Sequence, residues 1–351
     1  NVAARLPTPD QSTITSGTSE TYWTGALSNW GIDCVKKGYH VETLPAGDSM
    51  TYGNATHATD LSHYNVFIVD EPNIRFTNAE KLALLHFVQN GGGLFMIADH
   101  DMSDRNFDGW DSPNIWNDFM TNNGSVNNPF GIAFDLDNFS ETSTNIASNT
   151  DSLITGSMGT ATGLKYSGGT SMTLNPTANA TVKGIIYKTG SSFGNNNVML
   201  ARARYGLGKV AAIGDSSPCD DGTGSPIHTL YSSYSTDLSG SHQKLLMNTT
   251  IWLATSVVTA VSDITVSTNE IRIFPNPASE QTVVSYTIPL SADVALRLFD
   301  MSGRMIQTIE KKNQFAGRHS ETLNCSSLQK GVYLVEIKTG SVISTKKIII
   351  Q

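Results

Sequence analysis

The residues best suited to chemistry in this 351-residue chain follow directly after short apolar runs. Asp99, His100 and Asp101 come after residues 94–98, a run whose composition is typical of a buried strand in a parallel sheet. Carboxylates and imidazole move protons or bind hard cations, and their burial is costly without such a role. The spacing therefore predicts a functional site at the end of this run.

Two further apolar runs also end in acidic residues. Residues 66–69 precede Asp70 and Glu71, and residues 209–213 precede the block Gly214-Asp215-Ser216. If the three runs are parallel neighbours, their ends face one crevice, where crowded carboxylates raise a pKa or recruit a cation. The alternative is that these acids cap the helices or turns that follow them. The predicted catalytic residues are Asp99, His100, Asp101, Asp215 and Ser216.

Residues 104–111 resemble the first half of a calcium-binding loop. Gly109 stands where such a loop must turn, and Ile115 replaces the glutamate that would complete an EF-hand. We expect a divalent cation here, with calcium as the first candidate, that fixes the loop. The alternative is a loop held by Asx turns to its own backbone. The candidate ligands are Asp104, Asn106, Asp108 and Asp111.

Other polar and aromatic residues near these runs are candidates for substrate binding. They are Asp70, Glu71, Trp110, Asp220, Asp221 and His228. The block Gly214-Asp215-Ser216 also resembles the nucleophile segment of GDS-type esterases, with His228 and His242 downstream. It lies on the last strand rather than the first, and no Asp-x-x-His follows it, so a serine hydrolase is a third hypothesis beside the two below.

The composition excludes several classes of function. The net charge of −8 argues against nucleic acid as a partner, and no apolar run approaches the roughly 20 residues of a membrane span. The three cysteines match no metal or redox spacing, and no motif for an organic cofactor is present. Hydrophobic content of 39% with 30 glycines indicates a folded chain rich in loops.

Alternating strand and helix patterns predict a doubly wound, mostly parallel, flavodoxin-like α/β sheet in residues 1–255. Residues 20–37 and 241–254 have helical patterns, and residues 39–44 alternate like a strand. Thr77-x-x-Glu80 is a capping box for a helix to residue 89, and Ser112-Pro113 has the pattern of an N-cap and first turn. Residues 121–197 predict an inserted β-region or an antiparallel edge of the sheet.

Residues 256–270 have the composition of a linker, and residues 271–351 predict a separate small β-sandwich. This last segment closely resembles the type IX secretion C-terminal sorting domain of Bacteroidetes. The resemblance implies interaction with the type IX machinery, export across the outer membrane, and a secreted or cell-surface location. It rests on residues 274–278 (FPNPA), 298–304 (LFDMSGR), 330–335 (KGVYLV) and 347–351 (KIIIQ).

About residues 20–254 resemble the class I glutamine amidotransferase-like superfamily, in its uncharacterised secreted branch. The similarity lies in residues 77–80, 87–94 (FVQNGGGL) and 206–215 (GLGKVAAIGD). Members with glutaminase activity carry a nucleophilic cysteine at the turn where this chain has Ala98-Asp99-His100. Glutaminase activity is therefore not implied by the resemblance.

Two functional hypotheses follow. The first is a secreted hydrolase that acts on an extracellular polymer such as a polysaccharide, with a carboxylate/His or metal-supported site at Asp99, His100, Asp101 and Asp215. The second is a non-catalytic, cation-stabilised module that binds glycan or serves as a scaffold through the same crevice or an aromatic face.

Overall fold

The protein is described by a computed structural model that divides into two compact units, Asn1–Val258 and Thr259–Gln351. The described residues are 11, 14–19, 22–23, 25–45, 47–54, 56–222, 232–255, 272–288, 292–314, 317–339 and 342–351. The predicted linker at 256–270 lies outside them.

The first unit is organised on a mixed sheet with the strand order β1-β2-β12-β11-β10-β5. Pairing is parallel between β1 and β2 and between β2 and β12, whereas β12-β11, β11-β10 and β10-β5 are antiparallel. The sheet is therefore parallel in its first three strands only, and not for the greater part as expected. The strands of this path are β1 (Val66–Asp70), β2 (Gly93–Ile97), β5 (Asn145–Ile146), β10 (Lys183–Tyr187), β11 (Val198–Tyr205) and β12 (Gly208–Ile213).

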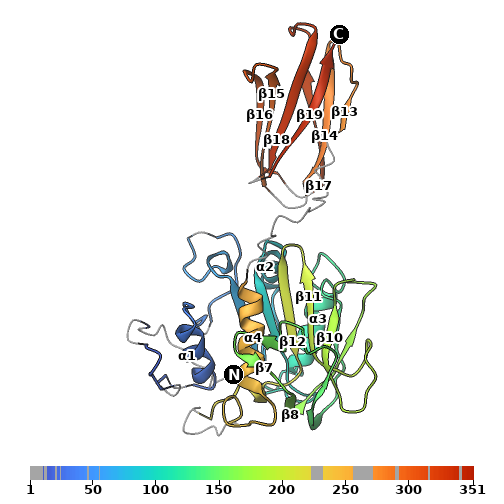
Figure 1. Ribbon diagram of the computed structural model, residues 1–351. Coiled ribbons are helices and arrows are strands. Elements are labelled where there is room, and N and C mark those ends of the chain that lie inside the picture. Colours follow the sequence, from blue (N-terminus) through green and yellow to red (C-terminus); the bar gives the residue numbers. More distant parts are fainter. Residues whose placement is uncertain are drawn as a thin grey trace. The chain divides into compact units, whose positions relative to one another are not determined.

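Helices cover both faces of this sheet, as the alternating pattern predicted. Figure 1 shows α4 lying across the sheet, where it contacts β2 and β12. Successive residues of β2 point to opposite faces, so Leu94 and Met96 join one core cluster, while Phe95 and Ile97 join the other. The helices are α1 (Ser28–Lys36) and α4 (His242–Ala254) on one face, and α2 (Asn78–Gln89) and α3 (Ser112–Thr121) on the other.

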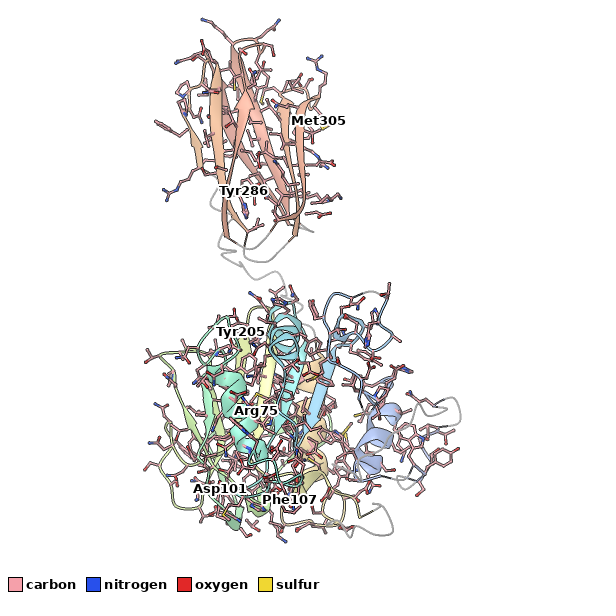
Figure 2. The ribbon with its side chains drawn as sticks, turned by 180° about the vertical axis from the view of Figure 1, so that it is seen from behind. Arg75, Asp101, Phe107, Tyr205, Tyr286 and Met305 are labelled. Carbon is pink, nitrogen blue, oxygen red and sulfur yellow. The ribbon has the colours of Figure 1, made fainter. Side chains whose placement is uncertain are left out.

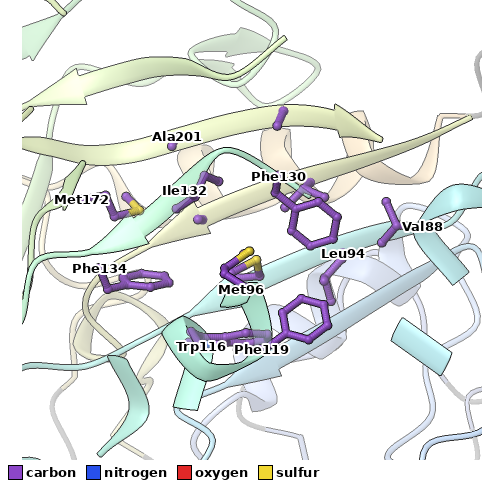
Figure 3. Packing of buried hydrophobic residues seen from close by; sticks show 14 of the residues in the cluster. Val88, Leu94, Met96, Trp116, Phe119, Phe130, Ile132, Phe134, Met172 and Ala201 are labelled. Atoms are coloured by element: carbon purple, nitrogen blue, oxygen red, sulfur yellow. The ribbon is translucent and has the colours of Figure 1, made fainter. Parts of the chain in front are cut away.

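The cluster under α2 and α3 combines aliphatic side chains with a group of aromatic ones. Trp116 and Phe119 of α3 pack edge-to-face with ring centroids 6.0 Å apart, and Phe130 lies 5.7 Å from Phe119 (Figure 3). Buried aromatic pairs in this arrangement add about 0.5–1.5 kcal/mol beyond their burial. The Trp116 indole N–H also donates to the carbonyl of Ile97, which fixes α3 against the end of β2. This packing sets the position of the loop between β2 and α3.

Two local expectations differ from the structure. Residues 39–44 have no regular secondary structure and belong to no strand among the described residues. The N-cap of α3 is Asp111 rather than Ser112, because the Asp111 side chain accepts the N–H of Asn114. The capping box of α2 is confirmed, with Thr77 and Glu80 satisfying each other's backbone N–H.

The region predicted as β-rich between residues 121 and 197 extends the sheet and folds over it. Strands β10 and β5 form its antiparallel edge, and β9 also pairs with β11. Two small hairpin-like sheets, β4–β8 and β6–β7, stand apart from it. The strands of this region are β3 (Ile132–Phe134), β4 (Phe139–Ser143), β6 (Thr155–Gly156), β7 (Gly159–Thr160), β8 (Leu164–Gly169) and β9 (Met172–Leu174).

The second unit has two antiparallel sheets, ordered β13-β14-β17 and β16-β15-β18-β19. Inward residues of both sheets form one core, including Val284 and Leu323 from the first sheet and Leu296 and Val335 from the second. This is the predicted all-β sandwich. Its strands are β13 (Arg272–Phe274), β14 (Gln281–Ile288), β15 (Ala292–Asp300), β16 (Met305–Gln314), β17 (Gly317–Asn324), β18 (Gly331–Thr339) and β19 (Val342–Ile350).

Cys34, Cys219 and Cys325 are buried free thiols. In the described part of the chain, no helix has the length and apolar character needed to cross a membrane.

Candidate functional site

The carboxyl ends of β1, β2 and β12 lie at one edge of the sheet. Asp70 is level with Ile97 of β2, and Ile97 is level with Ile213 of β12. Asp99 and Asp215 each follow their strand by two residues, so they extend from the same edge. The predicted convergence of acidic strand ends is therefore present.

This edge is opposite the turn that connects β11 to β12. Figure 2 shows Asp101 and Phe107 at one end of the unit and Tyr205, the last residue of β11, at the other. The site therefore lies at the carboxyl ends of the parallel strands, where open α/β sheets bind their ligands.

Asp99 and Asp215 are two buried acids of this edge whose pKa values are raised into the neutral range. Their residues are 3% and 0% exposed, respectively. Burial raises the pKa of Asp215 to about 8, and the negative charge of Asp99 adds to the shift. Burial, followed by repulsion from Glu71, raises the pKa of Asp99 to about 7, against the opposing effect of His100 and Arg105. Near neutral pH each carboxyl can therefore hold or release a proton.

The backbone around Asp215 fixes its orientation. Its Oδ2 accepts the N–H of Ser167 at 2.5 Å, and its Oδ1 accepts the N–H of Ser217 at 2.8 Å. A Cβ at Gly169 would lie 2.7 Å from the Asp215 Cβ and 2.8 Å from a backbone carbonyl, so only glycine allows this approach. The segment around β8 belongs to the region that the sequence predicted as inserted. It encloses the end of β12.

Arg105 connects the acids that follow β1 and β2. Its Nε donates to Glu71 Oε1 and its Nη2 donates to Asp99 Oδ2, both at 2.7 Å. The guanidinium side chain is 57% exposed, whereas the two carboxylates are each 4% exposed. Ser216 Oγ donates to the second Glu71 oxygen at 3.2 Å. Arg105 therefore separates the buried acids from solvent and partly neutralises them.

Glu71 occupies this position in a left-handed conformation, with φ +45°. Non-glycine residues adopt this region infrequently, and strain of this kind is found most often at functional sites. The Glu71 N–H donates to the carbonyl of Ile97, so the turn is fixed to the end of β2.

Asp70 is the least satisfied acid of the group. Both of its carboxyl oxygens are buried and have no hydrogen-bond partner among the described residues. Burial, followed by repulsion from Glu71, Asp220 and Asp99, raises its pKa well above the usual range. A buried polar group without a partner costs free energy, so this position needs a functional or structural explanation.

His100 and Asp101 turn away from the buried pair and toward the β-rich region. The His100 Nδ1 contacts the Asp101 carbonyl at 2.6 Å and the side-chain amide nitrogen of Asn138 at 3.1 Å. The ring packs against Gly168, where a Cβ would lie 3.4 Å from His100 Cδ2. Burial and a hydrogen bond with the Asp111 carboxylate raise the pKa of Asp101.

The predicted cation loop is held by hydrogen bonds to its own backbone. Asp104 accepts the N–H groups of Asp108 and Gly109 at 3.2 and 2.7 Å, and Asp108 accepts that of Trp110 at 2.9 Å. Asn106 accepts the Asp108 N–H at 3.3 Å. These are the Asx turns of the alternative interpretation. No group of three or more metal-ligating His, Cys, Asp or Glu side chains occurs within the described residues.

Asp111, the fourth predicted ligand, is separate from that loop. Its Oδ1 accepts the N–H of Asn114 as the cap of α3, and its Oδ2 accepts the N–H of Met102 at 2.8 Å. A carboxylate with these two contacts stabilises the turn between β2 and α3.

The remaining predicted site residues lie in different surroundings. One face of the Trp110 ring is covered by the Arg75 guanidinium, 3.9 Å from its centroid. Asp220 is near Asp70, whereas Asp221 accepts the N–H of Asn29 at 2.8 Å in the first turn of α1. His228 lies outside the described residues.

The serine-nucleophile hypothesis needs an imidazole beside Ser216, whereas Ser216 has a carboxylate beside it. The hydroxyl of Ser216 donates to Glu71, and His242 is occupied elsewhere. Its Nε2 accepts the Lys165 N–H at 3.2 Å, and its Nδ1 contacts the carbonyl of Ser233 at 3.1 Å.

Sequence reasoning missed Arg105 and Ser167. Arg105 lies within the predicted cation loop, where its charge is the feature that distinguishes it from the acidic residues around it. No sequence signal marks Ser167, because its contribution is a backbone N–H.

Comparison with known proteins identifies the second unit. Residues 272–351 match the model of the secretion system C-terminal sorting domain. This segment is a type IX sorting domain. The sorting domain directs the chain through type IX secretion to the cell surface or the extracellular space. It also implies interaction with the secretion machinery, as the four motifs predicted.

No curated protein matches the sequence. Among solved structures, a chain described as mmIFT52 N-terminal domain is similar, with 14% identity and a TM-score of 0.47. The match covers 70% of this chain and 97% of that chain. At this level the similarity carries no argument about the activity of the first unit.

Proposed function

We propose that the first unit is a secreted hydrolase of an extracellular polymer, and that polysaccharide is its substrate class. The observation that carries the proposal is the buried pair Asp99 and Asp215, whose pKa values are raised to about 7 and about 8 at adjacent parallel strand ends. Catalytic acids and bases work best when their pKa lies near the pH of the reaction. The sorting domain supports an extracellular substrate.

In the proposed reaction one carboxyl protonates the leaving oxygen and the other, as a carboxylate, activates the attacking water. Asp215 has the higher pKa and is the acid; Asp99, whose carboxylate is paired with Arg105, is the base. In this scheme His100, the next residue in the chain after Asp99, shuttles the proton. A divalent cation beside these acids would polarise the water in the same role.

The Arg105 contacts determine how substrate would reach this pair. The exposed guanidinium covers Asp99 and Glu71, so a polymer approaches the acids by displacing it or by binding against it. Met102 and Phe107 flank Arg105 in sequence and are 84% and 92% exposed. Exposed apolar side chains on a loop beside a site can pack against the apolar face of a sugar ring.

The test is release of reducing ends from a panel of extracellular polysaccharides by the full chain and its variants. We expect Asp215→Asn and Asp99→Asn to lower kcat by about 10²-fold or more, the usual contribution of a general acid or base. Asp237→Asn, a change in a surface pair with Lys165, is the matched control and keeps full turnover. Unchanged turnover in both site variants, with folding intact, would refute the assignment.

A second function, non-catalytic glycan binding, is favoured by the near-complete burial of Asp99 and Asp215. In this case the acids hold the strand ends together and the exposed loop binds glycan. Calorimetric binding that survives both substitutions, with no product released, distinguishes it from the hydrolase.

We also propose, from the sequence resemblance, that the first unit is a member of the class I glutamine amidotransferase-like superfamily without its cysteine. The arrangement that supports this is the sharp turn after β2, where Ala98 is buried and Asp99 enters the site. A flavodoxin-like relationship rests on the same three parallel strands, β1, β2 and β12.

A further inference from the structure

Strand β1 is at the edge of the sheet and has backbone groups that no strand satisfies. Its inward pairing with β2 uses alternate residues: Asn65 accepts the N–H of Gly93, and Glu71 donates to the carbonyl of Ile97. Because N–H and C=O groups alternate sides along a strand, the residues between them point outward. Within the described chain, no backbone group pairs with the outward groups of Val66, Ile68 and Asp70.

Residues 39–44 add side chains to both faces of the sheet, and within the described chain they do not pair with it. Each face collects side chains from this segment and from β1, as alternate strand residues would. On one face these are Tyr39, Val41, Val66 and Ile68. On the other they are Leu44, Phe67 and Val69. The segment thus lies where a strand beyond β1 would be, which explains why its sequence pattern predicted one.

The far side of this segment is already occupied. The side-chain amide of Gln11 donates to the Val41 carbonyl at 2.8 Å and accepts the Val41 N–H at 3.1 Å. The backbone groups of His40 and Glu42 alternate with those of Val41, so they face the opposite side, toward β1. Gln11 is not part of the wall that faces β1.

A cavity of about 630 Å³ separates the segment from β1. All residues of 39–44 form one wall and all residues of 65–70 form the other, with Trp30 of α1 and Thr250 of α4 beneath. Its volume is within the range of about 300–1,000 Å³ found for ligand sites. Two walls that expose strand backbone groups toward each other match an inserted strand better than a compact small molecule.

The charge of the walls defines the side chains that such a strand would carry. Asp70 contributes two buried carboxyl oxygens that have no hydrogen-bond partner among the described residues, at the carboxyl end of β1. Glu42 on the opposite wall is already bound by His40 and by the Tyr64 hydroxyl, so Asp70 is the acid that remains for an incoming side chain. A buried carboxylate without a partner is stabilised most by a cationic group that also donates hydrogen bonds. Asp70 is therefore the position where a lysine or arginine side chain would be bound.

We propose that this cavity, the β1 slot, binds an extended peptide segment that pairs with Val66, Ile68 and Asp70 through its backbone and places a basic side chain at Asp70. The segment completes the sheet between β1 and residues 39–44, with Glu42 and His40 on its other side. The ligand of this slot is a partner polypeptide rather than a glycan, and the proposal does not require turnover at the Asp99–Asp215 pair.

The test uses the full chain and an acetylated peptide about seven residues long, with alternating valine and threonine and a central lysine. Fluorescence anisotropy measures its affinity, and hydrogen–deuterium exchange measures protection of β1. We expect saturable binding that protects the amides of Val66 and Ile68. Replacing the lysine by norleucine, or Asp70 by Asn, weakens binding about tenfold or more, and the two changes together cost little beyond either one.

Two controls separate backbone pairing from insertion of a side chain. Methylating alternate amides of the peptide abolishes binding if the backbone pairs. Ile68→Pro removes an outward N–H without removing a bond to β2, so it abolishes binding while the sheet persists; Ile68→Ala is its matched control and retains binding.

Three results would overturn the proposal. One is lack of binding by the lysine peptide. Another is protection of the Val66 and Ile68 amides without peptide in dilute protein, which shows that the chain itself closes the slot. The third is protection that appears only as protein concentration rises, which assigns the slot to a second copy of the chain.

Discussion

Replacing Asp215 by Asn should change how stability depends on pH, because the folded protein holds the Asp215 proton far more tightly than the unfolded chain does. The side chain is fully buried, and burial followed by repulsion from Asp99 raises its pKa from 3.8 to about 8. For an acid with a raised pKa, the stabilising contribution is complete below about pH 4 and is lost as the pH rises toward 8. The free energy of unfolding of the first unit therefore falls across this window.

The size of the effect follows from the shift. A change from 3.8 to about 8 is about 4 pH units, and at about 1.4 kcal/mol per unit this corresponds to roughly 6 kcal/mol over the whole window. Between pH 5 and 7 Asp215 alone contributes a fall of about 3 kcal/mol. The amide side chain in the Asp215→Asn variant has no proton to release, so the variant loses this part of the slope. At pH 5 the variant is less stable by about 1–2 kcal/mol, because an amide has one acceptor for the N–H groups of Ser167 and Ser217.

Urea denaturation of the full chain at pH 5, 6 and 7, followed by tryptophan fluorescence, measures this difference. All 5 tryptophans precede residue 256, so the signal reports the first unit alone. Asp237→Asn is the matched control, because hydrogen bonds from Lys165 and Ser239 hold its pKa well below the usual range and its titration ends below pH 5. A wild-type slope that is flat or rising, or an Asp215→Asn slope equal to that of the wild type, would refute the reasoning.

Three further predictions concern other parts of the first unit. Lys81→Met leaves the Asp118 carboxylate buried without the ammonium group that lies 2.5 Å from it. We expect the first unit to lose about 3 kcal/mol of stability in the same urea assay. The double variant Lys81→Met, Asp118→Leu should regain this stability. Calcium at the 104–111 loop must compete with the N–H groups that are hydrogen-bonded to Asp104, so we expect weak binding, with a Kd of about 10⁻⁴–10⁻³ M by calorimetry. The Asp104→Asn variant should not bind calcium. Absence of binding heat in the wild type would exclude the ion there. Arg105→Met removes the cation beside Asp99, so the pKa of Asp99 should rise further in carboxyl-carbon NMR, whereas a fall would contradict the pairing.

Much of the site's location followed from the sequence, because it depends on strand order and on residue position alone. Apolar runs that end in Asp70, Asp99 and Asp215 predicted convergence, and parallel pairing of β1, β2 and β12 produces it. The strands β3, β5 and β9 were less visible, because they have only two or three residues each and lie among turns.

Contacts made by loops could not be read from the sequence. Arg105 reaches Glu71 across 34 positions, and that approach depends on the left-handed turn at Glu71. The alternating Asp and Asn residues at 104–111 fit a calcium loop and a series of Asx turns equally well, because both structures place a side-chain oxygen near the backbone. The sequence therefore could not distinguish the two. Asp111 also satisfies the pattern while it caps α3.

Residues 39–44 were predicted as a strand, but their surroundings in the fold leave them unpaired. Their alternating pattern correctly placed Tyr39 and Val41 toward one face, and that pattern predicted a strand. A β-strand also needs an adjacent strand at hydrogen-bonding distance, and here a cavity lies between the segment and β1. Hydrophobic alternation records which face a side chain occupies and does not record whether the backbone is paired.

The central claim, that Asp99 and Asp215 form an acid–base pair that cleaves polymer, is tested most directly by the pH dependence of kcat/KM on the best substrate of the polysaccharide panel. The account predicts a bell-shaped profile whose acidic limb reflects ionisation of Asp99 near pH 7 and whose alkaline limb reflects loss of the Asp215 proton near pH 8. Arg105→Met should displace the acidic limb upward. Activity that stays constant from pH 6 to pH 9, or no product from any polysaccharide, would contradict the claim.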